Sequence, residues 1–221
     1  MSVTIEGLSK RIRGVDVLKD VALSVEPGRV AGLAGPNGSG KTMLMRCVAG
    51  LIAPTSGTVE IDGKVLGRDI AFPPSIGLLI ESPAFLAGRS GFSNLQLLAS
   101  IRGTTEDSQI RHVIGLMGLD PDDRRPVRKY SLGMKQRLGI AAAVMESPDI
   151  VVLDEPTNAL DASGVQMVKQ VVAAQKARGA TVIVSCHDAQ TLRIMADEIF
   201  YFAEGHMDGY EDLTGGGERR G

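Results

Sequence analysis

The stretch "RVAGLAGPNGSGKTMLMRCVAGL", from Arg29 to Leu51, decides the fold. It opens with a short continuous apolar run, Val30 to Ala34, which is typical of a strand buried on both faces of a parallel sheet. A glycine-rich turn follows, and the apolar spacing from Met43 onward predicts a helix. The turn, Gly35 to Thr42, satisfies the pattern G-x-x-x-x-G-K-[ST], which requires a strand before it and a helix after it. The segment therefore predicts a βα unit built around a phosphate-binding loop.

The residue types of this loop suit the triphosphate of a nucleotide. Glycines let successive backbone N–H groups surround phosphate oxygens, the Lys41 ammonium reaches the β and γ phosphates, and the Thr42 hydroxyl takes a Mg²⁺ position. A glycine-rich turn with a chance lysine is the alternative, and the flanking strand and helix argue against it. The expected nucleotide contacts are Gly35, Pro36, Asn37, Gly38, Ser39, Gly40, Lys41 and Thr42.

Three further candidate groups follow buried strands later in the chain. In "DIVVLDEPTNALD", an apolar strand leads to Asp154, which is placed to hold Mg²⁺ largely through water. Adjacent Glu155 can orient or deprotonate an attacking water. Two solvated acids at a strand end are the simpler reading, which the preceding phosphate loop disfavours. In "VSCHD", His187 reaches the same carboxyl edge of the sheet, where ligands of open α/β sheets gather, and we expect it to contact the γ-phosphate.

Composition restricts the class of protein. The 221 residues suit one domain, and a net charge of −2 with 4% aromatic residues offers nucleic acid neither a basic field nor stacking platforms, so no nucleic acid partner is expected. No apolar run is long enough to span a membrane and no signal peptide pattern opens the chain, which predicts a cytoplasmic protein. Cys47 and Cys186 lie in apolar stretches, which favours buried reduced thiols over a disulfide.

The remaining segments predict an α/β fold, a P-loop NTPase with a central, mainly parallel sheet that includes "SIGLLIE", "DIVVLDE" and "ATVIVSCH". The alternating segments "SVTIEGLS", "DVALSVEPG" and "GTVEIDG" indicate an N-terminal antiparallel β layer. Helical periodicity from about residue 84 to 147 indicates an inserted helical subdomain, and a later crossover helix is expected to end at Gly179. Residues 1–221 form one domain, with the tail 214–221 expected to be disordered.

A second helix start stands almost a hundred residues after the phosphate loop, in "YSLGMKQRLGIA", Tyr130 to Ala141. The turn of Ser131, Leu132 and Gly133 opens it, and helix N-termini bind anions through unpaired N–H groups and the positive end of the macrodipole. An ordinary surface helix cap is the alternative.

Taken in order, the phosphate loop, the helical insertion, "YSLGMKQR", "VVLDEPTNALD" and "SCH" resemble the ATP-binding cassette (ABC) ATPases over roughly Ser2 to Glu204. No N-K-x-D guanine-reading motif competes with this reading. The resemblance implies ATP and Mg²⁺ as cofactors, and ATP hydrolysis with Lys41, Glu155 and His187 as catalytic residues.

The resemblance also implies partners. Two cassettes of this family close head to tail, so Ser131 and the Gly133 backbone would contact nucleotide held by the other subunit, and Asp161 would lie at the interface beside it. The complete motif set on one chain permits a homodimer, which we expect, and pairing with a different cassette stays open. Such closing and opening drives a membrane partner, which here would be a separate transmembrane permease, placing the chain at the inner face of the cell membrane.

Several positions depart from the family pattern, among them Leu132 and Met134 in the signature turn. Glu81, the last residue of "SIGLLIE", stands where a glutamine is usual, and with Thr42 and Asp154 it is an expected Mg²⁺ ligand. Ile12 stands where many cassettes have an aromatic residue that stacks on adenine. The loops "IESPAF" and "YSLGMKQRLGIA" resemble the bacitracin and lantibiotic branch, which implies export of a drug or antimicrobial peptide.

Several alternatives stay open. A soluble ABC ATPase of the iron–sulfur assembly type fits the size, and a weakly catalytic regulatory nucleotide-binding module fits the changes at Glu81 and Ile12. Phe85, Leu86 and Phe92 either form a docking cleft for the membrane subunit or pack inside the helical subdomain. The sequence does not name the transported molecule.

Overall fold

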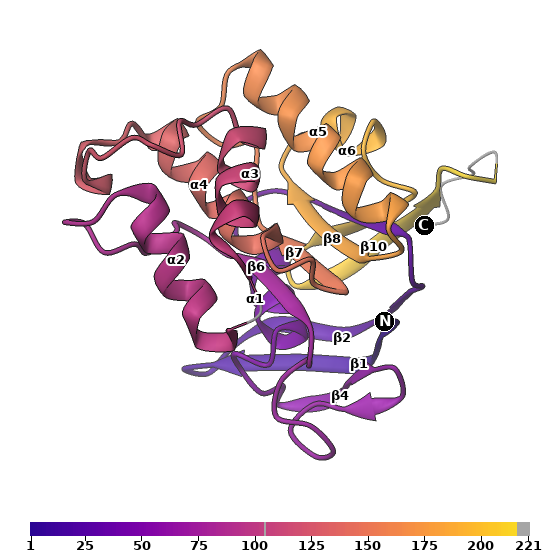
Figure 1. Cartoon of the computed structure of the whole chain (residues 1–221). Coiled ribbons are helices and arrows are strands. Elements are labelled where there is room, and N and C mark those ends of the chain that lie inside the picture. The colour runs from indigo at the N-terminus through magenta and orange to yellow at the C-terminus, as the bar shows by residue number, and fades with distance from the viewer. Residues whose placement is uncertain (104, 216–221) are drawn as a thin grey trace.

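Two β-sheets and a group of helices make up the fold, which a computed structural model describes for residues 1–103 and 105–215 (Figure 1). The smaller sheet is antiparallel and has the order β2-β1-β4-β5, with β1 (Val3–Ile12), β2 (Val15–Val25), β4 (Ser56–Ile61) and β5 (Lys64–Val65). The larger sheet has the order β10-β9-β3-β8-β7-β6, with β3 (Val30–Ala34), β6 (Ile76–Leu79), β7 (Ile150–Leu153), β8 (Thr181–Cys186), β9 (Glu198–Ala203) and β10 (His206–Asp212). The helices are α1 (Lys41–Val48), α2 (Gly91–Arg102), α3 (Asp107–Leu116), the 3₁₀ turn η1 (Val127–Lys129), α4 (Leu132–Val144), α5 (Ala162–Ala177) and α6 (Ala189–Arg193).

The predicted N-terminal antiparallel layer is confirmed, but the alternation of buried and exposed residues along β1 is interrupted once. On β1, Val3, Ile5 and Leu8 are buried. A strict period of two would bury residue 7, but Gly7 takes a left-handed conformation at φ +59°, and the pairing with β2 shifts between Ile5 and Leu8. The shift works as a bulge that returns Leu8 to the buried face.

The centre of the larger sheet is parallel, as predicted. Strands β3, β7 and β8 are buried along their whole length, and β3 pairs with β8, and β8 with β7, in parallel. Their carboxyl ends therefore lie at one edge of the sheet. The antiparallel hairpin of β9 and β10 at the far side was not anticipated, since the sequence of β10, "HMDGYED", lacks a continuous apolar run.

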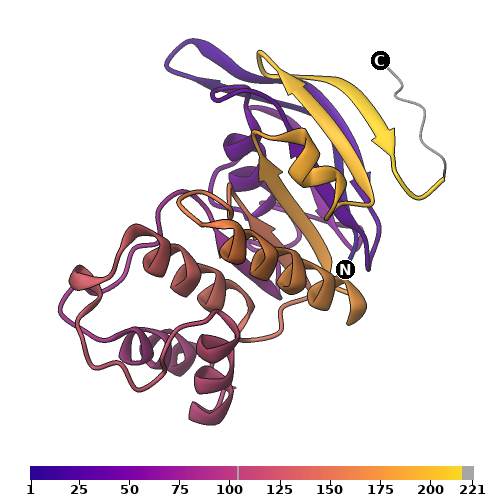
Figure 2. The same cartoon turned by 90° about the horizontal axis from the view of Figure 1, so that it is seen from above.

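The large sheet has a hydrophobic cluster on each face. Residues of β7 alternate between them: Ile150 and Val152 join the cluster that contains α1 and the small sheet, whereas Val151 and Leu153 join the cluster of α2 to α5. Figure 2 shows α2, α3 and α4 set to one side of the sheets, away from the β9–β10 hairpin. These three helices lie between β6 and β7 in the chain, within the predicted helical segment.

Several smaller expectations can be compared with the structure. Helix α5 ends at Ala177, two residues before the predicted end at Gly179. In the tail, Thr214 donates two hydrogen bonds to Asp212 Oδ1 within a turn, and residues 216–221 lie outside the described part of the chain. Cys47 and Cys186 are buried free thiols, as expected. Within residues 1–103 and 105–215, no helix has the length and apolar character needed to cross a bilayer.

Phe85, in the connection before α2, and Phe92, in the first turn of α2, both pack inward. Phe85 and Phe92 are partly buried against the helical cluster, and the Arg111 guanidinium lies 4.7 Å from the centre of the Phe92 ring. Leu86 is 50% exposed. Packing within the helical segment therefore accounts for both aromatic residues, and Leu86 alone presents an apolar side chain to solvent.

Close approach of α4 to β6 generates a stability prediction. A methyl group at Gly77 on β6 would collide with the backbone carbonyl of Ala143 on α4, so Gly77→Ala must push the helix away. We expect a loss of about 3 kcal/mol in the free energy of unfolding, measured by urea titration. Gly115→Ala is the matched control, because a methyl group there meets nothing within 4 Å and α3 gains about 0.5–1 kcal/mol of helix propensity. Equal effects of the two substitutions would contradict the packing described.

Candidate functional site

The phosphate loop connects β3 to α1 and needs glycine at two of its positions for steric reasons. Gly35 has φ +150°, and a side chain there would strike the carbonyl of Phe202 on β9. Gly40 has φ +108°, and a Cβ would lie 2.8 Å from Leu18 Cδ2 and 2.9 Å from the Val17 carbonyl oxygen. The loop is therefore pressed against β2 and β9, and only glycine fits at these points.

Polar groups in the loop are arranged for an anion. The Lys41 ammonium, 5% exposed, donates to the carbonyl oxygens of Gly35 at 2.7 Å and Pro36 at 3.0 Å. The hydroxyl oxygen of Ser39 is buried and has no hydrogen-bond partner among the described residues. A buried cation with an unpartnered hydroxyl beside it fits a phosphate group, which would satisfy both.

Thr42 and Asp154 meet as predicted for a Mg²⁺ site. The Thr42 hydroxyl donates to Asp154 Oδ2 at 2.7 Å, across 112 positions of sequence. The other carboxylate oxygen, Oδ1, accepts from the Ser185 hydroxyl at 2.6 Å. A hydroxyl and a carboxylate side by side are hard oxygen ligands of the kind that Mg²⁺ prefers, so the residues present fit this ion.

Ser185 was missed by sequence reasoning. It is fully buried on β8, and besides holding Asp154 it accepts a hydrogen bond from the backbone N–H of Glu155 at 2.9 Å. The signal was available: Ser185 is a polar residue directly after the apolar run Val182 to Val184, one position before the strand ends. A polar group buried at such a place needs a partner, and the facing strand end supplies it.

Glu155 and His187 also lie together. Glu155 Oε2 lies 3.1 Å from His187 Nδ1 and 3.3 Å from the His187 backbone nitrogen. The glutamate takes an unusual left-handed conformation, φ +48°, and its own carbonyl accepts from Gln136 Nε2 at 3.1 Å. Its Oε1 is buried without a partner among the described residues. This constellation can hold a water and take a proton from it.

A cavity of about 300 Å³ lies between the phosphate loop and the two acids, and His187 does not line it. Its lining residues are Val17, Asn37, Gly38, Gly40, Lys41, Thr42, Met43, Asp154 and Glu155. Val17, on β2, was missed; Ile12, expected near adenine, lies at the end of β1, is 37% exposed and does not line the cavity.

Glu81 occupies a different position from the other expected Mg²⁺ ligands. Its Oε1 accepts from Arg46 Nη2 on α1 at 2.7 Å, its side chain is 59% exposed, and it does not line the cavity. Glu81 is the second residue after β6, and its backbone takes a left-handed conformation with φ +59°. A role for Glu81 in Mg²⁺ binding stays a prediction, and it requires the carboxylate to leave Arg46.

The three residues predicted to meet nucleotide across an interface, Ser131, Gly133 and Asp161, also lie outside the cavity. Ser131 caps α4 and accepts from the Met134 N–H at 3.1 Å, and Gly133 packs so closely that a Cβ would lie 2.9 Å from the Ala159 carbonyl oxygen. Asp161 caps α5. Its carboxylate accepts hydrogen bonds from the Gly164 N–H and the Ser163 hydroxyl, and these bonds lower the pKa of the carboxyl. One chain therefore brings the phosphate loop together with Asp154 and Glu155, but not with Ser131, Gly133 or Asp161.

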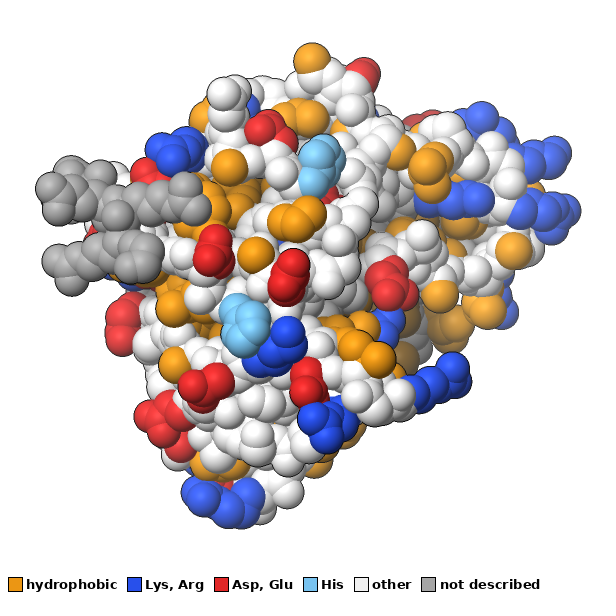
Figure 3. Space-filling model, turned by 180° about the vertical axis from the view of Figure 1, so that it is seen from behind, with side chains coloured by type: hydrophobic (Ala, Val, Ile, Leu, Met, Phe, Trp, Pro, Cys, Tyr) orange, Lys and Arg blue, Asp and Glu red, His pale blue; other side chains and the backbone are white. Residues whose placement is uncertain are grey.

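Charge on the molecular surface agrees with the composition. Figure 3 shows acidic and basic side chains of both signs over one face, with Lys and Arg gathered at the end formed by the helical segment.

Comparisons with known proteins extend these observations. A profile of the ABC transporter family matches residues 18–158. An uncharacterized ABC transporter ATP-binding protein of Bacillus subtilis is 41% identical, over 96% of this chain and 97% of its own length. A lantibiotic transport ATP-binding protein of Streptococcus pyogenes is 36% identical, over 95% and 93%. A bacitracin transport ATP-binding protein of Enterococcus faecalis is 37% identical, over 91% of this chain and 66% of its own length.

Solved structures show the same fold. A dimeric bacterial ABC transporter cassette superimposes with a TM-score of 0.88, at 24% identity, over 96% of this chain and 98% of its own. The chain belongs to the ABC transporter family. It is an ATPase subunit of that family, with ATP and Mg²⁺ as its cofactors.

The Ser185 hydroxyl generates a prediction for the site. Ser185→Ala removes one hydrogen bond to the Asp154 carboxylate and one from the Glu155 backbone, so both acids lose their fixed positions. We expect kcat for ATP hydrolysis to fall about tenfold, and the Mg²⁺ concentration for half-maximal activity to rise.

Thr181→Val is the matched control, since it removes a buried hydroxyl from the other end of β8, where Thr181 donates to the carbonyl of Met1. Steady-state kinetics of both variants at varied Mg²⁺ separate the two cases. An equal loss of kcat in both would show that the Ser185 hydroxyl acts only on stability.

Proposed function

We propose that this chain powers the export of a drug or antimicrobial peptide through a separate transmembrane permease, at the inner face of the cell membrane. The relatives named for lantibiotic transport and for bacitracin transport support this substrate class. Both are similar along more than nine tenths of this chain. Within the described residues no helix is suited to cross a bilayer, so a permease partner supplies the path.

The observation that carries the proposal is a site that is complete for phosphate, Mg²⁺ and water but open to solvent. Lys41, Thr42, Asp154 and Glu155 all line one cavity, whereas Ser131 lies outside it, on an exposed helix start. We propose that two copies of the chain pair head to tail, so that Ser131 and Gly133 of each copy close the cavity of the other. A homodimer buries the same surface on both subunits, which a single chain with every motif permits.

The residues at the cavity then have separate roles in ATP hydrolysis. Lys41 exchanges the carbonyls of Gly35 and Pro36 for phosphate oxygens, and its charge stabilises the negative charge of the transferring group. Mg²⁺, when bound, screens phosphate charge and fixes the geometry of in-line attack.

Glu155 and His187 act at the water. Glu155, with Oε1 unpartnered and Oε2 beside the His187 ring, accepts the proton of the attacking water. His187, 62% exposed, contacts the γ-phosphate and orients Glu155. Asp161 stands at the interface, ionised and held by Arg137 at 3.2 Å, next to the incoming nucleotide of the partner. Glu81 joins the Mg²⁺ site once it is released from Arg46.

Pairing through nucleotide predicts a mass change that can be trapped. Glu155→Gln keeps the shape of the side chain but removes the base, so ATP with Mg²⁺ is bound and not hydrolysed. We expect light scattering after size exclusion to show doubling of the mass with ATP–Mg²⁺ and a monomer without it. Adding Ser131→Arg places a bulky side chain at the contact and abolishes the doubling. A Glu155→Gln chain that binds ATP and stays monomeric would contradict head-to-tail pairing of this chain with itself.

Export predicts a phenotype that depends on hydrolysis. The tagged chain, isolated from its native membranes, is expected to bring down an integral membrane protein. Loss of the chain is expected to raise the sensitivity of the cell to bacitracin, the probe here, several-fold. The wild type restores resistance and Glu155→Gln does not. If the chain co-purifies with soluble iron–sulfur assembly proteins and not with a membrane protein, the exporter proposal fails.

A further inference from the structure

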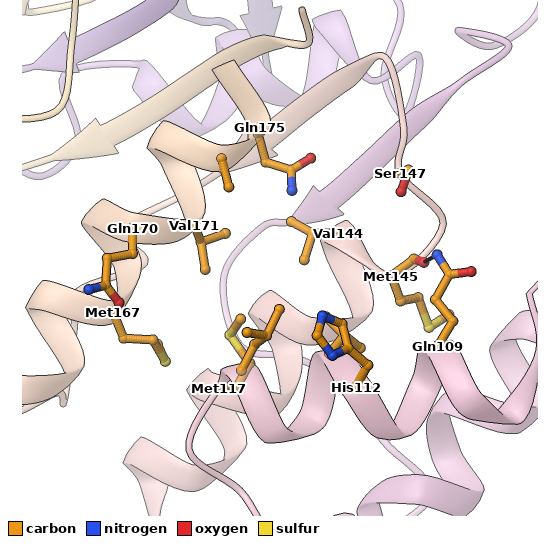
Figure 4. A pocket seen from close by; sticks show the side chains of 13 residues that line it. Gln109, His112, Met117, Val144, Met145, Ser147, Met167, Gln170, Val171 and Gln175 are labelled. Atoms are coloured by element: carbon orange, nitrogen blue, oxygen red, sulfur yellow. Dashed lines mark hydrogen bonds between the residues drawn. The ribbon is translucent and has the colours of Figure 1, made fainter. Parts of the chain in front are cut away.

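A second cavity, remote from the nucleotide site, opens between α3, the end of α4 and α5 (Figure 4). Its volume is about 340 Å³. Figure 4 shows His112 and Met117 at the α3 side and Met167, Gln170, Val171 and Gln175 facing them from α5. None of the residues assigned to ATP, Mg²⁺ or hydrolysis lines it.

The floor of this cavity is apolar and adaptable. It is formed by buried apolar residues: Val113, Met117, Val144, Met145, Met167 and Val171. Three of the six are methionines, whose flexible and polarizable side chains fit ligands of varied shape. The floor therefore favours an apolar ligand and can adapt to ligands of different shape.

The rim is polar but carries no carboxylate, ammonium or guanidinium. Among the described lining residues, the polar side chains are Gln109, His112, Ser147, Gln170 and Gln175. Gln109 Nε2 already donates to the Met145 carbonyl at 2.6 Å, and Gln175 Oε1 accepts from Arg178 at 2.7 Å. The side chains of His112 and Gln170 make no hydrogen bond within residues 1–103 and 105–215, so an imidazole and an amide are available to a ligand. No fixed charge is present to pair with an ionic ligand.

We propose that this cavity binds an uncharged, mainly apolar small molecule that carries one or two hydrogen-bonding groups. The volume lies at the lower end of the range for drug-sized ligands, roughly 300–1,000 Å³, and is too small for a partner helix about 10 Å across. The absence of charge in the lining excludes nucleotides and other anions, because their desolvation would go uncompensated. An uncharged apolar molecule loses little on leaving water and gains contact with the methionines.

A ligand here has a physical route to the nucleotide site. The carbonyl oxygen of Met117, a floor residue, accepts from Arg137 Nη1 at 3.3 Å, and Nη2 of the same guanidinium bonds Asp161 at 3.2 Å. Asp161 also begins α5, the helix that forms the facing wall. A ligand that separates α3 from α5 pulls Met117 from Arg137 and loosens Asp161. Its effect on turnover rests on the proposed function, whereas its binding does not.

The experiment compares two neighbouring alanines on α5. Ala174 lines the cavity and Ala173 does not, although both are exposed in the same helix. Nile red, an uncharged apolar dye, is titrated against wild type, Ala174→Phe and Ala173→Phe without nucleotide, and its blue-shifted fluorescence is followed. We expect saturable one-to-one binding to the wild type and to Ala173→Phe, and an affinity at least tenfold weaker for Ala174→Phe, whose ring occupies the cavity. Equal affinities for all three chains, or binding that does not saturate, overturn the proposed site.

Turnover tests the route to Asp161 separately. Saturating Nile red is expected to lower kcat for ATP hydrolysis at least twofold in wild type and Ala173→Phe, and to leave Ala174→Phe unchanged. If the dye binds as expected and kcat does not move, the coupling through Arg137 is wrong. If the dye does not bind while ATP is hydrolysed normally, the site is wrong and the assignment of the ATPase stands.

Discussion

Parallel pairing of β3, β8 and β7 is the constraint on which the site depends. Ala34 lies opposite Cys186, and Leu153 opposite Val184, so the three strands end at nearly the same level. Whatever follows each strand is delivered to one edge: the phosphate loop, the two acids and the histidine. The Ser185 hydroxyl then fixes the acids to the neighbouring strand. Register and one buried hydroxyl thus convert three distant segments into one site.

Several polar groups of this site are left without strong partners, which favours the binding of a triphosphate. Within the described residues, the Lys41 ammonium is bonded only to carbonyls of its own loop, and the buried oxygens Ser39 Oγ and Glu155 Oε1 have no partner. Buried polar atoms without partners raise the energy of the free protein. A ligand that satisfies them recovers that energy on binding. The left-handed backbone at Glu155 belongs to the same pattern, because strain of this kind collects where a side chain must be aimed.

Much of this was predictable because the local chemistry is explicit. Buried strands read as apolar runs, and the loop at Gly35 to Thr42 needs its residue types in a fixed order, so the central strands and the meeting of Thr42 with Asp154 could be predicted. The rest depends on three-dimensional neighbours. The sequence around Glu81 does not predict its ion pair with Arg46, because the two residues are 35 positions apart. Val17 likewise lines the cavity only because β2 lies beside the loop.

The central claim is that each cavity is completed by Ser131 of a second copy, and mixing two inactive variants tests it most directly. Glu155→Gln lacks the base and Ser131→Arg lacks the contact, so neither is expected to hydrolyse ATP alone. In a mixed dimer, the cavity of the Ser131→Arg chain keeps its own Glu155 and receives the intact Ser131 of the other. Half of all random encounters bring the two variants together, and each mixed pair has one intact site of two, so a 1:1 mixture is expected to recover about a quarter of wild-type activity. A mixture as inactive as its two components would contradict the account, because it would show that the Ser131 and Glu155 of one site come from the same chain.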